Sequence, residues 1–159
     1  MWTIRLVGIL LITTTAHAGT ITGRVVGMAD GDTLTILDSA NRQHRIRVAG
    51  IDAPEKAQDF GQRSKTNLSA MAFNQPATAD CPKRDRYGRE VCKIVVNGQD
   101  VGLEQIRAGM AWWYKQYSRE QSSEDRADYE QAEIQAKIHR KGLWDSKDPV
   151  PPWEWRRRR

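Results

Sequence analysis

Three short polar clusters carry the residue types that chemistry on a phosphate diester needs. They are "DGD" at 30–32, "RVAGIDAPE" at 47–55 and "RDRYGR" at 84–89. Carboxylates offer hard oxygen ligands to a divalent cation, and arginine offers a planar fork that matches two phosphate oxygens. The clusters together predict a site for a metal ion and a phosphate group.

Each side chain in these clusters has a candidate role. A phosphodiester repels an attacking nucleophile, and its transition state gathers further negative charge on the phosphoryl oxygens. Arg47 and Arg89 are candidates to bind those oxygens. Asp32 and Asp52 are candidate ligands of a divalent cation. Glu55 is a candidate base for a water molecule, and water is the natural nucleophile because no Ser-His-Asp pattern or phosphate-binding glycine loop occurs.

Taken singly, each cluster also has an ordinary structural explanation. "DGD" is a common turn sequence, "DAPE" suits a turn from a strand into a helix, and "RYGR" suits a hairpin loop with surface arginines. An arginine within a strand, such as Arg47, more often faces solvent. The functional interpretation rests on their joint occurrence, in order and at strand ends.

The elements that must position these clusters are five strands followed or interrupted by three helices. Strands are expected at 21–28, 33–37, 44–51, 77–81 and 91–96, and helices at 58–73, 101–111 and about 123–140. The apolar side of the last helix is expected to comprise Tyr129, Ala132, Ile134, Ala136 and Ile138. Five antiparallel strands with Greek-key closure indicate an α+β, mainly β fold: a five-stranded OB-fold barrel with three packed helices.

Residues 1–18 have the pattern of a cleaved export signal. Arg5 precedes the apolar run "LVGILLI", and "AHA" at 16–18 is a small-x-small cleavage site. A buried strand or a membrane anchor is the alternative, but the run is short for a bilayer. We expect one domain over 19–145, a Pro-, Trp- and Arg-rich tail over 146–159, and no membrane association after cleavage.

The net charge lies mainly at the end of the chain. Loss of Arg5 leaves 24 basic and 20 acidic side chains, and Arg156–Arg159 account for the whole excess of +4. A basic isoelectric point therefore does not by itself indicate nucleic-acid binding. The tail has two interpretations: a basic arm that adds phosphate contacts, or a solvated end.

Cys81 and Cys92 are the only cysteines. An even number in an exported chain favours a disulfide, whereas the histidines lack the spacing of a zinc site. A Cys81–Cys92 bond would close the loop that contains "RDRYGR" and hold Arg89 in place.

The clusters are also where the chain resembles a known family. "DGDT" at 30–33, "IRVAGIDAPE" at 46–55, "DRYGR" at 85–89 and "GLW" at 142–144 resemble the staphylococcal nuclease family in its exported bacterial branch. The resemblance extends from Ile21 to Trp144. It implies an OB barrel with three helices and a Ca²⁺-dependent phosphodiesterase that acts on DNA and RNA, leaving 3′-phosphate and 5′-hydroxyl ends.

The resemblance also implies roles for individual residues. Asp32, Asp52 and the backbone carbonyl of Ala53 would bind Ca²⁺, although the type member has threonine where Ala53 stands. Glu55 would position or deprotonate the attacking water, and Arg47 and Arg89 would bind phosphate. The expected nucleotide contacts are Tyr87 and Tyr117, with Tyr114 near the latter, and Asp30 is either a group behind the metal ligands or a turn stabiliser.

Two other functions compete with that of an exported endonuclease. One is a non-catalytic nucleic-acid-binding OB module, which would have no need of three carboxylates beside a phosphate. The other is an exported OB domain that binds a protein or glycan. We expect a monomeric enzyme, periplasmic or secreted, with DNA and RNA as substrates.

Overall fold

A computed structural model describes residues 19–158, and the expected export signal lies outside them. The strands are β1 Gly19–Met28, β2 Thr33–Leu37, β3 Gln43–Val48, β4 Ile51–Asp52, β5 Pro76–Arg84, β6 Glu90–Val96, β7 Gln99–Asp100 and β8 Trp112–Trp113. The helices are α1 Gly61–Ala72, α2 Val101–Arg107, α3 Ser123–Ile138 and α4 Pro152–Arg157, with 3₁₀ helices η1 Lys115–Glu120 and η2 Gly142–Asp145. None of the described helices is long and apolar enough to cross a lipid bilayer.

Five strands close into the predicted OB-type barrel. The sheet order is β3-β2-β1-β5-β6-β7, and an additional pairing of β3 with β6 completes the ring. This closing pair is parallel, with Arg47 opposite Val91, so the expectation of five antiparallel strands was wrong at that one seam. The residues in the closing pair are distant in sequence, and no local turn reveals their direction.

The barrel interior is filled by the buried alternate residues of the strands. In β6 the pattern buries Glu90, Cys92, Ile94 and Val96 and leaves the residues between them partly exposed. Such a period of two is typical of strands that present one face to a core. The β-branched strand segments predicted from sequence therefore point their apolar side inward.

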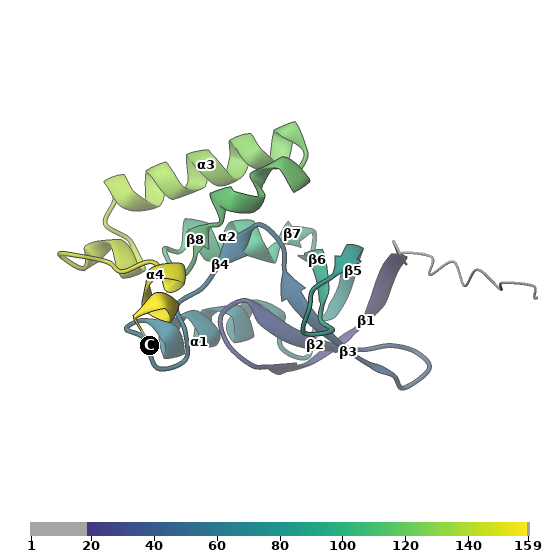
Figure 1. Cartoon of the computed structure of the whole chain (residues 1–159). Helices are drawn as coiled ribbons and strands as arrows, with labels where there is room; N and C mark the ends of the chain where they lie inside the picture. Colours follow the sequence, from purple (N-terminus) through teal and green to yellow (C-terminus); the bar gives the residue numbers. More distant parts are fainter. Residues whose placement is uncertain (1–18, 159) are drawn as a thin grey trace, which may run out of the picture.

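The helices cover one end and one side of the barrel (Figure 1), where α3 runs over α2 and β8. Helix α3 is capped by Ser122, whose Oγ accepts a hydrogen bond from the Asp125 amide at 3.0 Å. Tyr129, buried between α3 and α2, donates its hydroxyl to Asp100, the N-cap of α2. This contact ties the two helices to the end of the barrel sheet.

The predicted apolar face of α3 was partly wrong. Tyr129, Ala132 and Ala136 are buried, but Ile134 and Ile138 are 43% and 65% exposed. A helix turns by about 100° per residue, so positions 134 and 138 lie on the face opposite the stripe formed by the other three.

The C-terminal tail contains a short helix that the sequence did not predict. Helix α4, drawn in yellow in Figure 1, lies near α1 and β4. Pro152 at its first turn is buried, and proline is favoured there because its missing N–H would have no helical partner. The tail is therefore packed on the domain.

Candidate active site

Strand pairing brings the three polar clusters to one rim of the barrel. Arg47 in β3 lies opposite Thr33 in β2 and next to the start of β6. Arg89 directly precedes β6, and Asp52 ends the short strand β4 that follows β3. The parallel seam therefore places both arginines beside the acids.

Asp32 and Asp52 converge on a single atom of Arg47. Arg47 Nη2 lies 3.1 Å from Asp52 Oδ1 and 3.5 Å from Asp32 Oδ2. Arg47 Nη1 donates to the main-chain carbonyls of Val48 and Ile51 at 3.2 and 3.0 Å. These four contacts fix the guanidinium plane in the corner between β3 and β4.

Both aspartates are almost removed from solvent, with 6% of Asp32 and 1% of Asp52 exposed. Burial raises the pKa of Asp52, and a hydrogen bond from Arg156 opposes that rise. Burial and the neighbouring charge of Asp32 raise the pKa of Asp30 to about 6. The site thus concentrates negative charge where water cannot screen it, and a cation there is strongly favoured.

The "DGD" segment is held in place by a close approach to α1 and α2. A Cβ on Gly31 would lie 1.9 Å from Ser64 Oγ, so only glycine fits between the turn and α1. The buried Gln105 side chain donates to the Gly31 carbonyl at 2.7 Å and to the Ser64 carbonyl at 3.1 Å. Gln105 could not be predicted from the sequence, because none of its neighbours in the chain links it to the turn.

Asp32 is also fixed by its neighbours. Its Oδ2 accepts the Ala53 amide at 2.9 Å, and its Oδ1 accepts the Thr33 hydroxyl at 3.0 Å. Asp30 Oδ1 accepts the Asp32 amide at 3.1 Å. Asp30 therefore stabilises the turn and lies beside the predicted ligand, so both interpretations of this residue describe part of its position.

Asp85 orients Arg89. Its Oδ1 accepts the main-chain amides of Tyr87 and Arg89, and its Oδ2 accepts Arg89 Nε at 2.7 Å. Arg89 Nη1 donates to Thr33 Oγ1 at 3.3 Å, which links it to Asp32 through one hydroxyl. Within residues 19–158, Arg89 Nη2 has no hydrogen-bond partner, so it can donate to a ligand.

Arg156, in α4, contacts two acids of the site, Asp52 and Glu55. Its guanidinium contacts both oxygens of Asp52, with Nη1 at 3.2 Å from Oδ1 and Nη2 at 2.8 Å from Oδ2. Nη1 also donates to Glu55 Oε1 at 2.7 Å. Sequence analysis placed this arginine in the basic tail and did not predict its position, since its partners lie about a hundred residues earlier.

An aromatic group borders the site, since Trp112 in β8 pairs with Asp52 in β4. Burial, and then the charge of Asp52, raise the pKa of Tyr114, which follows β8. Tyr117 is 40% exposed and meets the Tyr114 ring edge-on. Trp153 stacks on Tyr114 with the ring planes 4° apart.

Tyr87 projects from the hairpin beside Arg89. It is 66% exposed, and the guanidinium groups of Arg86 and Arg89 lie 4.9 and 5.5 Å from its ring centroid. An exposed ring next to phosphate-binding groups can accept a stacked base, as on single-strand binding surfaces. The structure keeps Tyr87 available for such a contact.

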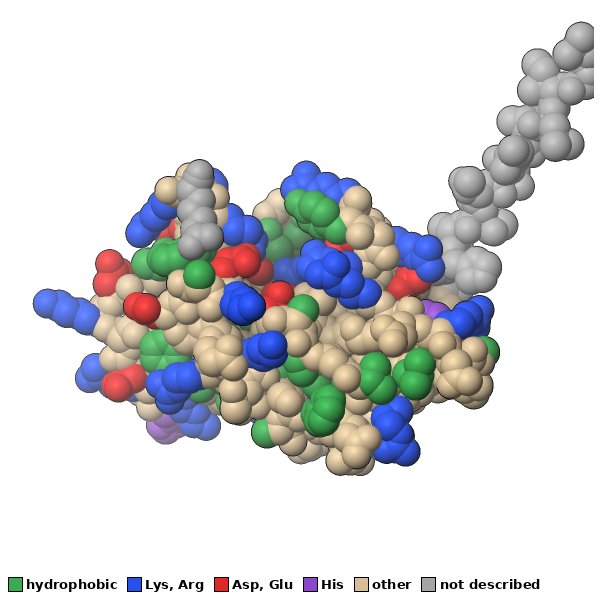
Figure 2. Space-filling view, turned by 90° about the horizontal axis from the view of Figure 1, so that it is seen from below, with side chains coloured by type: hydrophobic (Ala, Val, Ile, Leu, Met, Phe, Trp, Pro, Cys, Tyr) green, Lys and Arg blue, Asp and Glu red, His purple; other side chains and the backbone are tan. Residues whose placement is uncertain are grey.

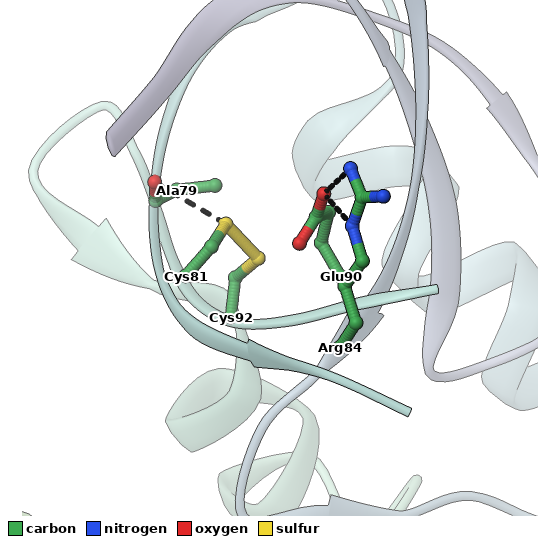
Figure 3. The surroundings of a disulfide bond; sticks show 5 residues. All are labelled: Ala79, Cys81, Arg84, Glu90 and Cys92. Atoms are coloured by element: carbon green, nitrogen blue, oxygen red, sulfur yellow. Dashed lines mark hydrogen bonds and ion pairs between the residues drawn. A yellow bond between two sulfur atoms is a disulfide. The ribbon is translucent and has the colours of Figure 1, made fainter. Parts of the chain in front are cut away.

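The disulfide predicted from the cysteine count is present (Figure 3). It joins Cys81 in β5 to Cys92 in β6, and the ion pair between Arg84 and Glu90 lies beside it. The bond fixes the base of the hairpin that carries Asp85 and Arg89.

The acids fit a hard divalent cation better than a transition metal. Within residues 19–158, no three side chains of His, Cys, Asp or Glu are grouped as a ready metal cage. Asp32 and Asp52 nevertheless approach the same Arg47 atom, and all their donors are hard oxygens. Such a pair suits a cation that completes its coordination with main-chain carbonyls and water.

The fold and the site together define an OB-barrel protein with an acid-and-arginine centre at its rim. Residues 45–146 match the family model of the staphylococcal nuclease homologues. An uncharacterized endonuclease of Haemophilus influenzae is 41% identical over 86% of this chain and 73% of its own length. One of Escherichia coli O157:H7 is 39% identical over 87% of each chain.

A third relative, the micrococcal nuclease of Shigella flexneri, is 37% identical over 85% of this chain and 80% of its own length. The chain belongs to the staphylococcal nuclease family. The family expected from the sequence motifs is thereby confirmed.

Proposed function

We propose that this protein is an exported, Ca²⁺-dependent endonuclease. It would hydrolyse the phosphodiester bonds of DNA and RNA with an activated water and leave 3′-phosphate and 5′-hydroxyl ends. The observation that carries the proposal is the convergence of Asp32 and Asp52 on Arg47, at the rim where Arg89 and Glu55 also lie. The nuclease names of its relatives support the same activity.

Asp32, Asp52 and the Ala53 carbonyl would hold the metal ion. A divalent cation bound there supplies positive charge that stabilises the phosphoryl oxygens and an ordered water. The two buried carboxylates already have a fixed geometry, because Thr33, Ala53 and Arg47 hold their oxygens. The two carboxylates themselves would then need little rearrangement to accept a cation.

The two arginines would bind the phosphate from the strands that close the barrel. Arg89 has its Nε fixed by Asp85 and its Nη2 free to donate. Arg47 is fixed by two carbonyls and the acids. Guanidinium groups held in this way can stabilise charge that develops on the phosphoryl oxygens without first having to reorient.

Glu55 would position or deprotonate the attacking water. Its side chain is 39% exposed, so it has access to solvent, and its main-chain amide is fixed by Gln58 Oε1 at 3.1 Å. Removal of a positioned base lowers a rate by about 10²–10⁴-fold. The proposal therefore requires that loss of the Glu55 carboxylate lowers the cleavage rate by a factor in this range.

The proposal is tested by cleavage of plasmid and single-stranded DNA with Ca²⁺ and then with EGTA. The Asp52→Ala, Glu55→Ala double variant and the single variant Glu55→Gln should lose activity, the latter by about 10²–10⁴-fold. Glu130→Gln, an exposed change on α3, is the matched control and should remain fully active.

A non-catalytic binding module is the alternative that the experiment must separate. Retention of DNA without cleavage in any divalent metal would favour that module and contradict the proposal. Cleavage that persists in EGTA would contradict the Ca²⁺ dependence alone.

We further propose that the enzyme acts as a monomer in the periplasm or outside the cell.

A further inference from the structure

The C-terminal segment 150–158, here called the strap, lies across Asp52 and Glu55 of the candidate active site. We propose that the strap is an autoinhibitory device in which Arg156 takes the place of the metal's charge, competes with Ca²⁺ for Asp52 and also occupies Glu55. The inference rests on the proposed function, since it concerns access to the same metal site.

Arg156 occupies both carboxylate oxygens of Asp52. Asp52 Oδ1 already accepts Arg47 Nη2 at 3.1 Å, and Arg156 adds Nη1 to Oδ1 and Nη2 to Oδ2. A cation that takes an oxygen of Asp52 as ligand must therefore displace at least part of the Arg156 guanidinium. The bidentate contact is the strong form of an arginine–carboxylate pair.

The same guanidinium also engages Glu55 at 2.7 Å. The Glu55 Oε1 atom that accepts Arg156 Nη1 is a carboxylate oxygen that would otherwise accept a hydrogen bond from the attacking water. One arginine thus blocks both the proposed metal ligand and the proposed water-activating group.

The strap is docked by contacts that do not involve Arg156. Gln58 Nε2 donates to the Val150 carbonyl at 2.6 Å, and Pro152 is buried. Trp153 stacks on Tyr114 and meets Trp112 edge-on at 5.6 Å between ring centroids. These contacts keep the strap close to the site, so its arginine has a high effective concentration at the acids.

The arginine itself is placed where it can leave. Its side chain is 42% exposed, and it lies in the last turn of a six-residue helix near the end of the chain. A helix of that length depends on tertiary contacts and has little stability of its own. Arg156 can therefore withdraw from Asp52 while Trp153 and Pro152 remain docked.

The expected effect follows from population arithmetic. If Arg156 covers the acids in about nine molecules of ten, the apparent Ca²⁺ affinity is about tenfold weaker than that of the uncovered site. Substitution of Arg156 should therefore tighten the apparent Ca²⁺ affinity by about tenfold. If the effect came only from the loss of one positive charge, substitution of any nearby arginine would change the affinity equally.

The test measures Ca²⁺ binding by calorimetry on the mature protein without nucleic acid. Arg156→Gln should bind Ca²⁺ about tenfold more tightly than the unsubstituted protein. Arg157→Gln removes the same charge from the next residue, which makes no ion pair within residues 19–158, and should change the affinity little. Hydrogen exchange of residues 150–158 should rise when Ca²⁺ is added to the unsubstituted protein.

Equal affinities in the three proteins, with active cleavage and unchanged exchange of the strap, would overturn the inference and leave the proposed function standing. Absence of Ca²⁺ binding in all three proteins would overturn both. Tighter binding by Arg156→Gln alone, together with faster exchange, would establish the competition.

Discussion

Asp85 contributes to the candidate site by fixing the side chain of Arg89. It accepts two main-chain amides of the hairpin and the Nε of Arg89, and it lies in the motif that also contains Tyr87. It does not contact the acids of the site. It is therefore a positioning residue for Arg89, which has the free donor group.

We expect Asp85→Asn to lower kcat more than it raises KM, because Arg89 would lose the partner that fixes its plane while the metal ligands stay in place. A loss of about tenfold or more in kcat is the expected size for a misplaced phosphate-binding group. Steady-state kinetics on a short DNA duplex, with Ca²⁺ affinity measured in parallel, check the prediction. The control is Asp128→Asn on α3, and an Asp85→Asn enzyme with unchanged kcat would contradict it.

The contact between Asp85 and Arg89 should also make the stability of the hairpin depend on pH. Burial alone would raise its pKa, but hydrogen bonds from Arg89 and the hairpin amides outweigh that and hold the pKa below its usual range. The stabilisation is thus present above the usual aspartate pKa, about 4, and is lost as the pH falls below it. The hairpin contacts should weaken only in acid.

At the residue scale, the sequence motifs predicted the acids and arginines because each has neighbours that mark its type of site. Asp32, Arg47, Asp52 and Arg89 are brought together as expected. Gln105 and Arg156 were missed for one reason. Each acts on a partner far away in the chain, and the local sequence around it contains no trace of that partner.

At the scale of elements, the β5–β6 hairpin depends on the disulfide at its base. Cys81 and Cys92 lie eleven residues apart, and Asp85 and Arg89 lie in the loop they close. A bulge interrupts the pairing between Asp80 and Lys83, so the regular hydrogen-bond ladder is broken next to Cys81. The covalent link therefore secures a hairpin whose ladder is incomplete.

We expect the Cys81→Ser, Cys92→Ser double variant to be less stable by about 2–3 kcal/mol, from the chain entropy that an eleven-residue separation implies. Its activity should also fall, because Arg89 would be less firmly placed. Thermal and denaturant unfolding measure the first effect, and DNA cleavage measures the second.

The control for this prediction is reducing agent. Dithiothreitol should lower the melting temperature of the unsubstituted protein and leave that of the double variant unchanged. A melting temperature that is the same with and without the bond would show that the hairpin does not need it.

Element types could be predicted where a period runs through several residues. The strands show alternation, and the serine before α3 is a residue type that commonly caps a helix. Helix α4 could not be predicted, because six residues with prolines before them have no period, and its position depends on contacts with Tyr114 and Gln58. Tertiary contacts, which decide such short helices, are invisible in local sequence.

At the scale of the whole molecule, basic and acidic side chains are mixed over the domain, and the excess of positive charge lies in the terminal arginines. Figure 2 shows Lys and Arg side chains interspersed with acidic ones over the face in view. This agrees with the near balance of 25 basic and 20 acidic residues in the chain. Recognition of a polyanion would then depend on the arginines placed at the site more than on a general basic surface.

The small-x-small pattern at 16–18 sets a prediction for export. We expect a signal peptidase to cleave after Ala18. Mass spectrometry of the protein from the periplasm or medium of a bacterial host should give Gly19 as the first residue.

An Ala18→Arg variant is the matched control for export, because a large charged residue at the cleavage site should block processing. Its unprocessed chain should stay with the cell membrane fraction. Recovery of uncleaved, unsubstituted protein from the cytosol would contradict the export prediction.

The parallel seam between β3 and β6 also determines at what stage after synthesis the site can assemble. Arg47 lies on one strand of the seam, and Arg89 directly precedes the other. A ribosome that has released the chain only as far as Gly88 has not yet made β6, so the barrel is open and the two arginines are not held together. If the chain is exported unfolded, as we propose, it has no seam during passage either. The site is therefore assembled only after synthesis and, under the proposed export, after passage across the membrane.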